Sequence, residues 1–167
     1  MKPRYYVLYS LIIAVGIIID QLSKLLVVKF LKPIDDVPLW DGVFHFNYHE
    51  NQGAAFGMLA DNRWVFIIIS TVAIIGIGLY LFFGKASNTL MGVSMALIVS
   101  GGIANMIDRI FLGYVVDFLY FKLIDFAIFN VADAFVCIGA GLMILALILE
   151  LIEESEKAKG AEGNDDK

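Results

Sequence analysis

Cysteine and histidine are scarce in this sequence, and their scarcity excludes several kinds of site. Cys137 is the only cysteine, so neither an intramolecular disulfide nor a cysteine metal cluster can form. It lies in an apolar run, where we expect it to pack. The 2 histidines, His45 and His49, have Glu50 beside them but no HExxH pattern. Solvent-facing histidines are therefore the better interpretation, and we expect no metal and no cofactor.

The usual residues of nucleophilic catalysis are also missing. The chain has no GxSxG sequence, and a serine triad would have to recruit one of the 2 histidines. Ser23 and Lys24 are neighbours on an expected helix, so their side chains point about 100° apart. No base is evident near Cys137 in the sequence. No basic block or basic-aromatic pattern suggests a nucleic-acid partner.

Charge is absent from long stretches, which indicates a membrane protein. Hydrophobic residues make up 60% of the chain, and the mean hydropathy is +0.82. A soluble domain is nearer half apolar. The first apolar segment follows Lys2 and Arg4 like a signal peptide but lacks a small-residue cleavage site, so we expect it to be retained. Four segments approach the ~20 residues that a membrane helix needs: 5–31, 64–83, 90–107 and 134–152.

These segments predict an all-α integral membrane protein with four transmembrane helices. Four spans place both termini on one side, and the basic N-terminus favours the cytoplasm. Residues 1–155 would form a single domain with extracytoplasmic loops 32–63 and 108–132. Residues 156–167 are charged and lack apolar periodicity, which predicts a disordered cytoplasmic tail.

The first outer loop contains a strand signal. Apolar residues alternate with polar ones through 43–48, which places Phe44, Phe46 and Tyr48 on one face. We expect a small β-rich structure on the membrane surface, where Trp40 and Tyr48 could anchor it.

Several polar residues lie within or beside the apolar segments. Asp20 and Lys24 are four apart on the first expected helix and can pair. A structural ion pair is the favoured interpretation, although an ionisable residue within a span is also a functional candidate. Asn51 and Gly53 follow the expected strand, and both a packing turn and a functional site remain open for them.

The end of the third segment brings three polar residues towards one region. Asn105, Asp108 and Arg109 are spaced so that their side chains share one side of a helix. An interfacial cap with Arg109 reaching the lipid headgroups is the alternative. Their position next to an aspartate-rich segment favours a site.

Three aspartates lie in the apolar stretch 116–133. Asp117 and Asp133 would both lie near the outer membrane surface. Two carboxylates brought close together cannot both ionise easily, so one keeps a proton. Such a pair can hydrolyse an amide: the charged acid activates water and the protonated acid polarises the carbonyl. Asp125 follows Lys122 by three residues and is interpreted as a solvated loop acid.

The polar residues fall into five motifs: Asp20-Gln21-x-x-Lys24, Asn51-x-Gly53-Ala54-Ala55-Phe56, Asn105-x-x-Asp108-Arg109, Val116-Asp117-Phe118 and Phe129-Asn130-x-Ala132-Asp133. In this order they resemble a known family, signal peptidase II, also called lipoprotein signal peptidase. Any one of them alone would be weak, but five in the family's order are specific.

The resemblance implies an aspartic endopeptidase of the bacterial inner membrane. Such an enzyme removes signal peptides from prolipoproteins, cleaving before a cysteine that carries a diacylglyceryl group, and it is a target of globomycin. By the family pattern Asp117 and Asp133 are catalytic. Residues expected to bind substrate or support the site are Asn51, Gly53, Asn105, Asp108, Arg109, Asn130, Ala132, Asp20 and Lys24. Ala104 departs from the pattern, because the family often has glycine there.

Two other functions are compatible with a small four-helix membrane protein. A small four-helix transporter would use buried acids near the bilayer midplane, whereas Asp117 and Asp133 lie at segment ends. A non-enzymatic membrane scaffold would leave the grouping of Asp117, Asp133, Asn105 and Arg109 unexplained. Membrane lipids are expected partners in every case.

Overall fold

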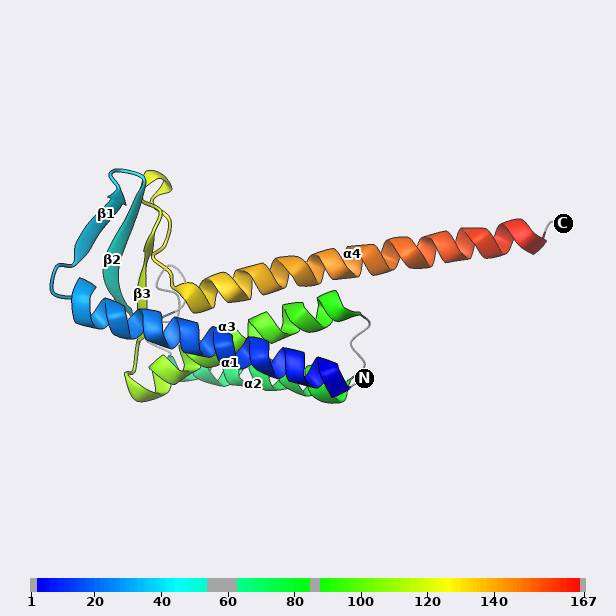
Figure 1. Cartoon of the computed structure of the whole chain (residues 1–167), viewed down its shortest axis with the longest axis horizontal. Coiled ribbons are helices and arrows are strands. Elements are labelled where there is room, and N and C mark those ends of the chain that lie inside the picture. The colour runs from blue at the N-terminus through cyan, green and yellow to red at the C-terminus, as the bar shows by residue number, and fades with distance from the viewer. Residues whose placement is uncertain (1–2, 54–62, 85–87, 166–167) are drawn as a thin grey trace.

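The computed structural model describes residues 3–53, 63–84 and 88–165 of the 167-residue chain. Helices α1, α2 and α3 lie side by side, a small sheet stands across one end of them, and α4 extends past the other end (Figure 1). The elements in chain order are α1 (Pro3–Leu26), a π-helical turn η1 (Val27–Leu31), β1 (Asp36–Trp40), β2 (Phe44–Asn51), α2 (Arg63–Phe83), α3 (Thr89–Phe111), β3 (Val115–Tyr120), a 3₁₀ turn η4 (Lys122–Ile124) and α4 (Val131–Asp165).

Among the residues that the structure describes, three helices are long and apolar enough to cross a membrane, which confirms the membrane-protein prediction. They are Tyr5–Leu31, Thr89–Phe111 and Val131–Lys157. In α2 the apolar stretch within the described part is shorter, Ile67–Phe83. The crossing of the membrane by this fourth helix therefore stays a prediction.

Helix α3 occupies the centre of the bundle, where it packs against α1, α2 and α4. Glycine permits the close approach of α3 to the backbone of α4: a Cβ at Gly101 would overlap the backbone carbonyl oxygen of Ala132. A Cβ at Gly139 of α4 would likewise lie 2.7 Å from the carbonyl oxygen of Ser94. The helix continues to Phe111, beyond the expected end at 107, so Asp108 and Arg109 are helical.

The sheet has the order β1-β2-β3 with antiparallel pairing throughout. Its central strand β2 confirms the strand predicted over 43–48. The small β-rich structure expected beside the all-α bundle is therefore confirmed, although the positions of the two flanking strands were not predicted. Pro38 interrupts β1, which is tolerated because β1 pairs on one side only and its other edge needs no donor. Strand β3 comes from the second outer loop, where its branched and aromatic residues suit a strand.

A register shift in β2 overturns the expected position of Tyr48. The pairing with β3 slips by one residue between Phe46 and His49, and such a bulge exchanges the two faces of the strand. Phe46 opposes Leu119, whereas the Tyr48 hydroxyl donates to Glu50 (2.8 Å) on the other face. Phe44 and Phe46 therefore share a face without Tyr48.

The histidine prediction is correct for His49 and wrong for His45. His49 is exposed, whereas only 2% of His45 is exposed. His45 Nδ1 lies 2.9 Å from Asp36 Oδ2, and Nε2 accepts a hydrogen bond from the Gly42 N–H at 3.3 Å. A histidine with partners for both ring nitrogens can be buried, which sequence alternation alone does not reveal.

The C-terminal segment differs from the predicted disorder. Helix α4 continues through Asp165, and its side chains from 151 to 157 are exposed. Glutamate, alanine and lysine are good helix formers, and the Lys157–Glu153 pair at 2.6 Å spans one helical turn. Helical propensity therefore extends α4 past the bundle without burial of apolar surface (Figure 1).

Candidate active site

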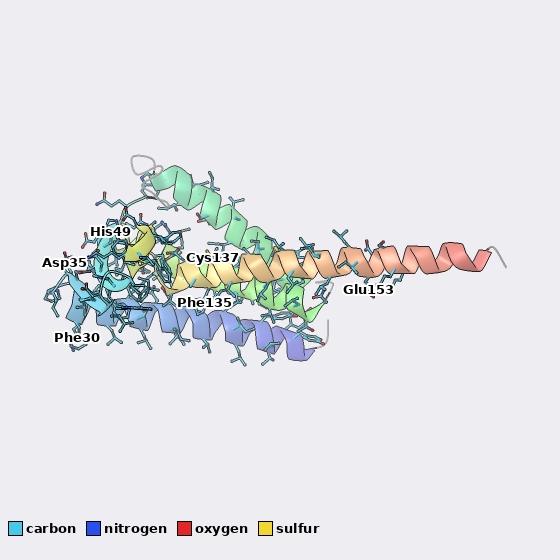
Figure 2. The ribbon with its side chains drawn as sticks, turned by 90° about the horizontal axis from the view of Figure 1, so that it is seen from above. Phe30, Asp35, His49, Phe135, Cys137 and Glu153 are labelled. Carbon is cyan, nitrogen blue, oxygen red and sulfur yellow. The ribbon has the colours of Figure 1, made fainter. Side chains whose placement is uncertain are left out.

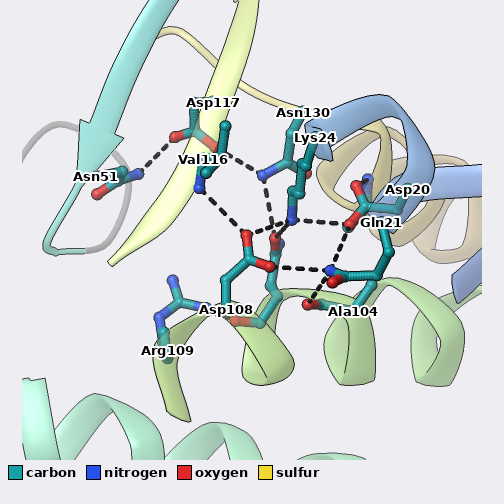
Figure 3. A network of polar contacts seen from close by, with 12 residues as sticks. Asp20, Gln21, Lys24, Asn51, Ala104, Asp108, Arg109, Val116, Asp117 and Asn130 are labelled. Carbon is teal, nitrogen blue, oxygen red and sulfur yellow. Dashed lines mark hydrogen bonds and ion pairs between the residues drawn. The ribbon is translucent and has the colours of Figure 1, made fainter. Parts of the chain in front are cut away.

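Four elements bring the predicted site residues together where the sheet meets the bundle. Asp117 lies on β3, and Asp133 lies in the first turn of α4. The end of α3 contributes Asn105, Asp108 and Arg109, and α1 contributes Asp20 and Lys24 (Figure 3). The sequence analysis placed both acids at the ends of apolar segments, and the structure shows that Asp117 is held by a strand.

Asp117 is completely buried and accepts two amide hydrogen bonds. Asn51 Nδ2 donates to Oδ2 at 2.8 Å, and Asn130 Nδ2 donates to Oδ1 at 2.6 Å. Burial, followed by the nearby charge of Asp133, raises the pKa of Asp117 to about 7, although the two amides oppose this shift. This carboxyl group can therefore hold a proton at neutral pH.

Asp133 is fixed by the way α4 begins. Asn130 Oδ1 accepts from the Asp133 N–H at 2.9 Å, and Asp133 Oδ2 accepts from the Asn130 N–H at 3.1 Å. This reciprocal pair has the form of a capping box, with asparagine at the N-cap and aspartate three residues later. The other oxygen, Oδ1, accepts from Asn105 Nδ2 at 2.7 Å. Asn130 thus contacts both acids, since its side chain also reaches Asp117.

A buried lysine organises the layer behind the two acids. Lys24 Nζ lies 2.8 Å from Asp20 Oδ2 and 2.9 Å from Asp108 Oδ2, which confirms the predicted Asp20–Lys24 pair. It also donates to Asn105 Oδ1 at 2.9 Å. These three acceptors match the three hydrogens of an ammonium group. Because Lys24 occupies Oδ1, the Asn105 amide presents its NH₂ group to Asp133.

The two carboxylates that bind Lys24 also hold the backbone next to Asp117 and Asp133. Asp20 Oδ1 accepts from the Ala132 N–H at 2.8 Å at the start of α4, and Asp108 Oδ2 accepts from the Val116 N–H at 3.2 Å in β3. Each contact lies one residue before Asp133 or Asp117. The pairing of α1 with α3 therefore sets the position of both acids.

Gln21 belongs to this network but was not predicted as a site residue. Its Nε2 donates to Asp108 Oδ1 at 2.9 Å and to the Ala104 carbonyl at 3.2 Å (Figure 3). Its place directly after Asp20 in the first motif was the available signal. Ala104 itself is completely buried, so the methyl group in place of the usual glycine fits the packing.

Arg109 joins the first outer loop to α3. Its guanidinium donates to the Gly53 carbonyl and to the Asn105 carbonyl, each at 3.4 Å. The Gly53 N–H in turn donates to Asn51 Oδ1 at 3.0 Å, which directs the amide of Asn51 towards Asp117. The remaining residues of that motif, Ala54, Ala55 and Phe56, lie outside the described residues.

Asp125 lies apart from the two acids, as the sequence predicted. It is exposed, ends the turn η4 in a left-handed conformation (φ 48°) and accepts from the Tyr120 hydroxyl at 2.6 Å. Within the described ranges, no three His, Cys, Asp or Glu side chains gather as a metal site would require. The arrangement is suited to acid–base chemistry: a buried and a half-buried carboxyl group are surrounded by amide donors, with the cations Lys24 and Arg109 nearby.

The face of the sheet that carries Asp117 is aromatic. His49 opposes Asp117 and Phe46 opposes Leu119, and residues directly opposite or two apart share a face. Phe44 lies on this face, 5.9 Å from the ring of Phe46. Its ring also lies 4.9 Å from that of Phe121. An apolar surface therefore leads away from the site.

Comparison with known proteins gives the same family as the motifs. Residues 12–149 match the family model for signal peptidase (SPase) II. A lipoprotein signal peptidase of Brevibacillus brevis is 43% identical over 142 residues, 85% of this chain and 95% of that protein. One of Halalkalibacterium halodurans is 40% identical over 154 residues, 91% of this chain and 96% of that protein.

Solved structures agree with the sequence comparison. A bacterial membrane enzyme solved at 2.3 Å resolution superposes with a TM-score of 0.77 at 32% identity, covering 86% of this chain and 88% of that one. A second, solved at 1.9 Å, gives 0.74 at 34% identity, with coverage of 83% and 91%. The chain thus belongs to the signal peptidase II family.

Proposed function

We propose that this protein is an aspartic endopeptidase that removes signal peptides from bacterial prolipoproteins. Asp117 and Asp133 are the catalytic pair. The observation that carries this proposal is the position of Asn130, whose side chain donates to Asp117 while its backbone N–H donates to Asp133. One residue thereby keeps the buried Asp117 and the half-buried Asp133 in a fixed relation, as a shared-proton dyad requires.

The two acids take different roles in the proposed reaction. Asp117, with its pKa raised to about 7, holds the shared proton and donates a hydrogen bond to the scissile carbonyl oxygen. Asp133 accepts a proton from water, and the water oxygen attacks the carbonyl carbon. The leaving amine then takes up a proton as the C–N bond breaks, which returns the dyad to one proton.

The surrounding residues support this chemistry through contacts that can be named. Asn51 and Asn105 each donate to one acid, and Arg109 places positive charge beside both. Gly53 holds Asn51, whereas Lys24 holds Asn105. The backbone positions of the two acids are set by Asp20 acting on Ala132 and by Asp108 acting on Val116.

The proposed substrate is a prolipoprotein with a diacylglyceryl-modified cysteine, cleaved immediately before that cysteine. The protein would cross the inner membrane four times, with both termini cytoplasmic and the dyad near the extracytoplasmic surface. The aromatic face of Phe44, Phe46 and Phe121 is suited to an acyl chain or to an apolar inhibitor such as globomycin.

Conservative substitution of the acids tests the proposed dyad. Asparagine keeps the size of aspartate but cannot exchange a proton in this range. Asp117→Asn and Asp133→Asn should each abolish nearly all cleavage of a lipid-modified prolipoprotein peptide, and the double variant should be little worse because the pair acts as a unit. Initial rates are measured at matched protein levels.

The matched control for this test is Asp125→Asn, which removes an exposed acid from the same connecting region. It should keep nearly wild-type activity. An inactive Asp125→Asn protein alongside a substantially active Asp117→Asn or Asp133→Asn protein would refute the assignment.

The lipid requirement is tested separately with a pair of substrates. Each buried methylene of an acyl chain contributes about 0.8 kcal/mol, so the same peptide with an unmodified cysteine should be cleaved far more slowly. Measurement of kcat/KM for both peptides decides this point. Equal values would show that the lipid plays no part in recognition.

A further inference from the structure

Four large apolar side chains are exposed at the far end of the sheet, outside every helix that is long enough to cross a membrane. Leu39 and Trp40 end β1 and are 67% and 69% exposed. Leu123 and Ile124 lie in η4 and are 70% and 69% exposed. We refer to these four residues as the tip patch.

The patch is assembled by contacts between segments far apart in the sequence. Trp40 pairs across the strands with Phe44, and the Phe44 ring lies 4.9 Å from that of Phe121, directly before η4. The Leu123 N–H donates to the Val43 carbonyl at 3.3 Å, which joins η4 to the turn between β1 and β2. These contacts hold the end of β1 and η4 together at one end of the sheet.

The orientation of the sheet indicates what covers this surface. The strands run crosswise to the helices at one end of the bundle, and the turn between β1 and β2 lies at the end of the sheet farthest from α1, α2 and α3 (Figure 1). Helices that cross a bilayer run roughly along its normal. The strands then lie along the membrane surface, and their tip extends over lipid beside the bundle.

The residue types at the tip match the membrane interface. Tryptophan prefers the headgroup level, where its ring has both an apolar and a polar environment. Charged residues border the patch: Asp41 in the hairpin turn, and Lys122 and Asp125 on either side of Leu123 and Ile124. Apolar side chains with a charged border suit shallow insertion into a lipid surface.

We propose that the tip patch inserts into the leaflet on the sheet side of the membrane and anchors the sheet there. The sequence suggested Trp40 and Tyr48 as anchors, but the Tyr48 hydroxyl is bonded to Glu50 and the Lys32 ammonium lies 4.9 Å from its ring centroid. The anchor is Trp40 together with the apolar residues of β1 and η4. Because β3 belongs to the same sheet, this attachment also fixes the height of Asp117 relative to the bilayer.

Tryptophan fluorescence in lipid tests the proposal. Trp64→Phe leaves Trp40 as the only tryptophan. In nanodiscs, lipids brominated near the headgroup end of the acyl chain should quench Trp40 more strongly than lipids brominated at its far end, and aqueous iodide should quench it less than in detergent. The quenching should be lost in Leu123→Ser/Ile124→Ser, whereas Ile34→Ser, an exposed apolar residue outside the patch, should leave it unchanged.

Several outcomes would overturn the anchor. If iodide quenched Trp40 equally in lipid and in detergent, and brominated lipids did not quench it, Trp40 would lie in water. Protection that appears only at two proteins per nanodisc would assign the patch to contacts between copies. The inference rests on the membrane position of the chain and not on the proposed catalysis, so Asp117→Asn should show the same quenching whether or not it is inactive.

Discussion

Asp117 is an acid at a buried strand position where an apolar residue would be expected. Asp117 lies between Val116 and Phe118 and is fully buried. A strand residue with this degree of burial is ordinarily apolar. Two asparagines, each from a different element, supply the hydrogen bonds that make its burial possible. Its raised pKa follows from the same burial, so the cost of placing the acid there is also the source of its proposed reactivity.

The pKa of Asp117 predicts the alkaline side of the pH–rate profile. Below a pH of about 7 the group holds its proton, and above it the proton is lost, so cleavage should fall as the pH rises through about 7. Asn51 donates to the ionised form and thereby lowers the pKa. Asn51→Leu removes that donor at similar volume, so the descending limb should move to higher pH by about one unit.

The matched control for this shift is Asn47→Leu. Asn47 lies on the same strand, but its side chain donates to Asp36 instead of Asp117. Its profile should coincide with that of the wild type. Rates are measured from pH 5 to 9 in one detergent, and a limb that stays in place or moves to lower pH in Asn51→Leu would contradict the proposed role of this hydrogen bond.

At the scale of elements, the dyad depends on how closely α3 and α4 approach. Asp133 lies in the first turn of α4, directly after Ala132. The Ala132 carbonyl oxygen lies where a Cβ at Gly101 would be. In the same turn, Asp133 accepts a hydrogen bond from the Asn105 side chain. A rigid helix transmits a displacement at its first turn directly to a side chain on that turn, so the packing of α3 against α4 would be coupled to the proposed catalysis.

Gly101→Ala should therefore reduce activity while the protein remains folded. The added methyl group overlaps the backbone of α4 and must push its first turn away from Asn105, and a shift of about 1 Å can lower a rate about 100-fold. We expect kcat to fall far more than the melting temperature in detergent.

Gly141→Ala provides the comparison on α4, because nothing in the described structure lies within 4 Å of a Cβ at that position. It should be active and slightly more stable, since alanine favours a helix by about 1 kcal/mol over glycine. Equal activity of Gly101→Ala and Gly141→Ala would show that the α3–α4 approach does not position Asp133.

At the scale of the whole molecule, the two ends of the bundle differ, and this difference bears on the orientation of the protein in the membrane. The sheet lies at one end of the bundle, with Asp117 on β3 and Asp133 in the first turn of α4, and α4 extends past the other end (Figure 1). Figure 2 gives the view at right angles, in which Cys137 lies on α4 near the sheet end and Glu153 lies far along the same helix. The proposed topology places the sheet outside the cell and the end of α4 in the cytoplasm.

Cysteine labelling checks this topology. In a Cys137→Ser background, a membrane-impermeant thiol reagent added to sealed spheroplasts should label Asp41→Cys, in the exposed hairpin turn, but not Ser155→Cys on α4. Both sites should react after the membrane is permeabilised, which controls for exposure. The reverse pattern in sealed cells would require the opposite orientation.

The sequence by itself determined the features that depend on local composition and spacing. Apolar runs of sufficient length predicted membrane helices, alternation predicted β2, and the i,i+4 spacing of Asp20 and Lys24 predicted their pair. The order of the polar motifs identified the family. All of these signals consist of the composition, spacing or order of residues along the chain, so they can be read without knowledge of the fold.

The tertiary structure alone decided how these pieces meet. A one-residue bulge turned Tyr48 away from the aromatic face, and β3 formed in a loop because β2 offered it an edge. Lys24 reaches Asn105 across 81 positions, and Asp20 reaches Ala132 across 112. Such contacts leave no periodic trace in a single sequence, because they satisfy buried polar groups between segments that only folding brings together.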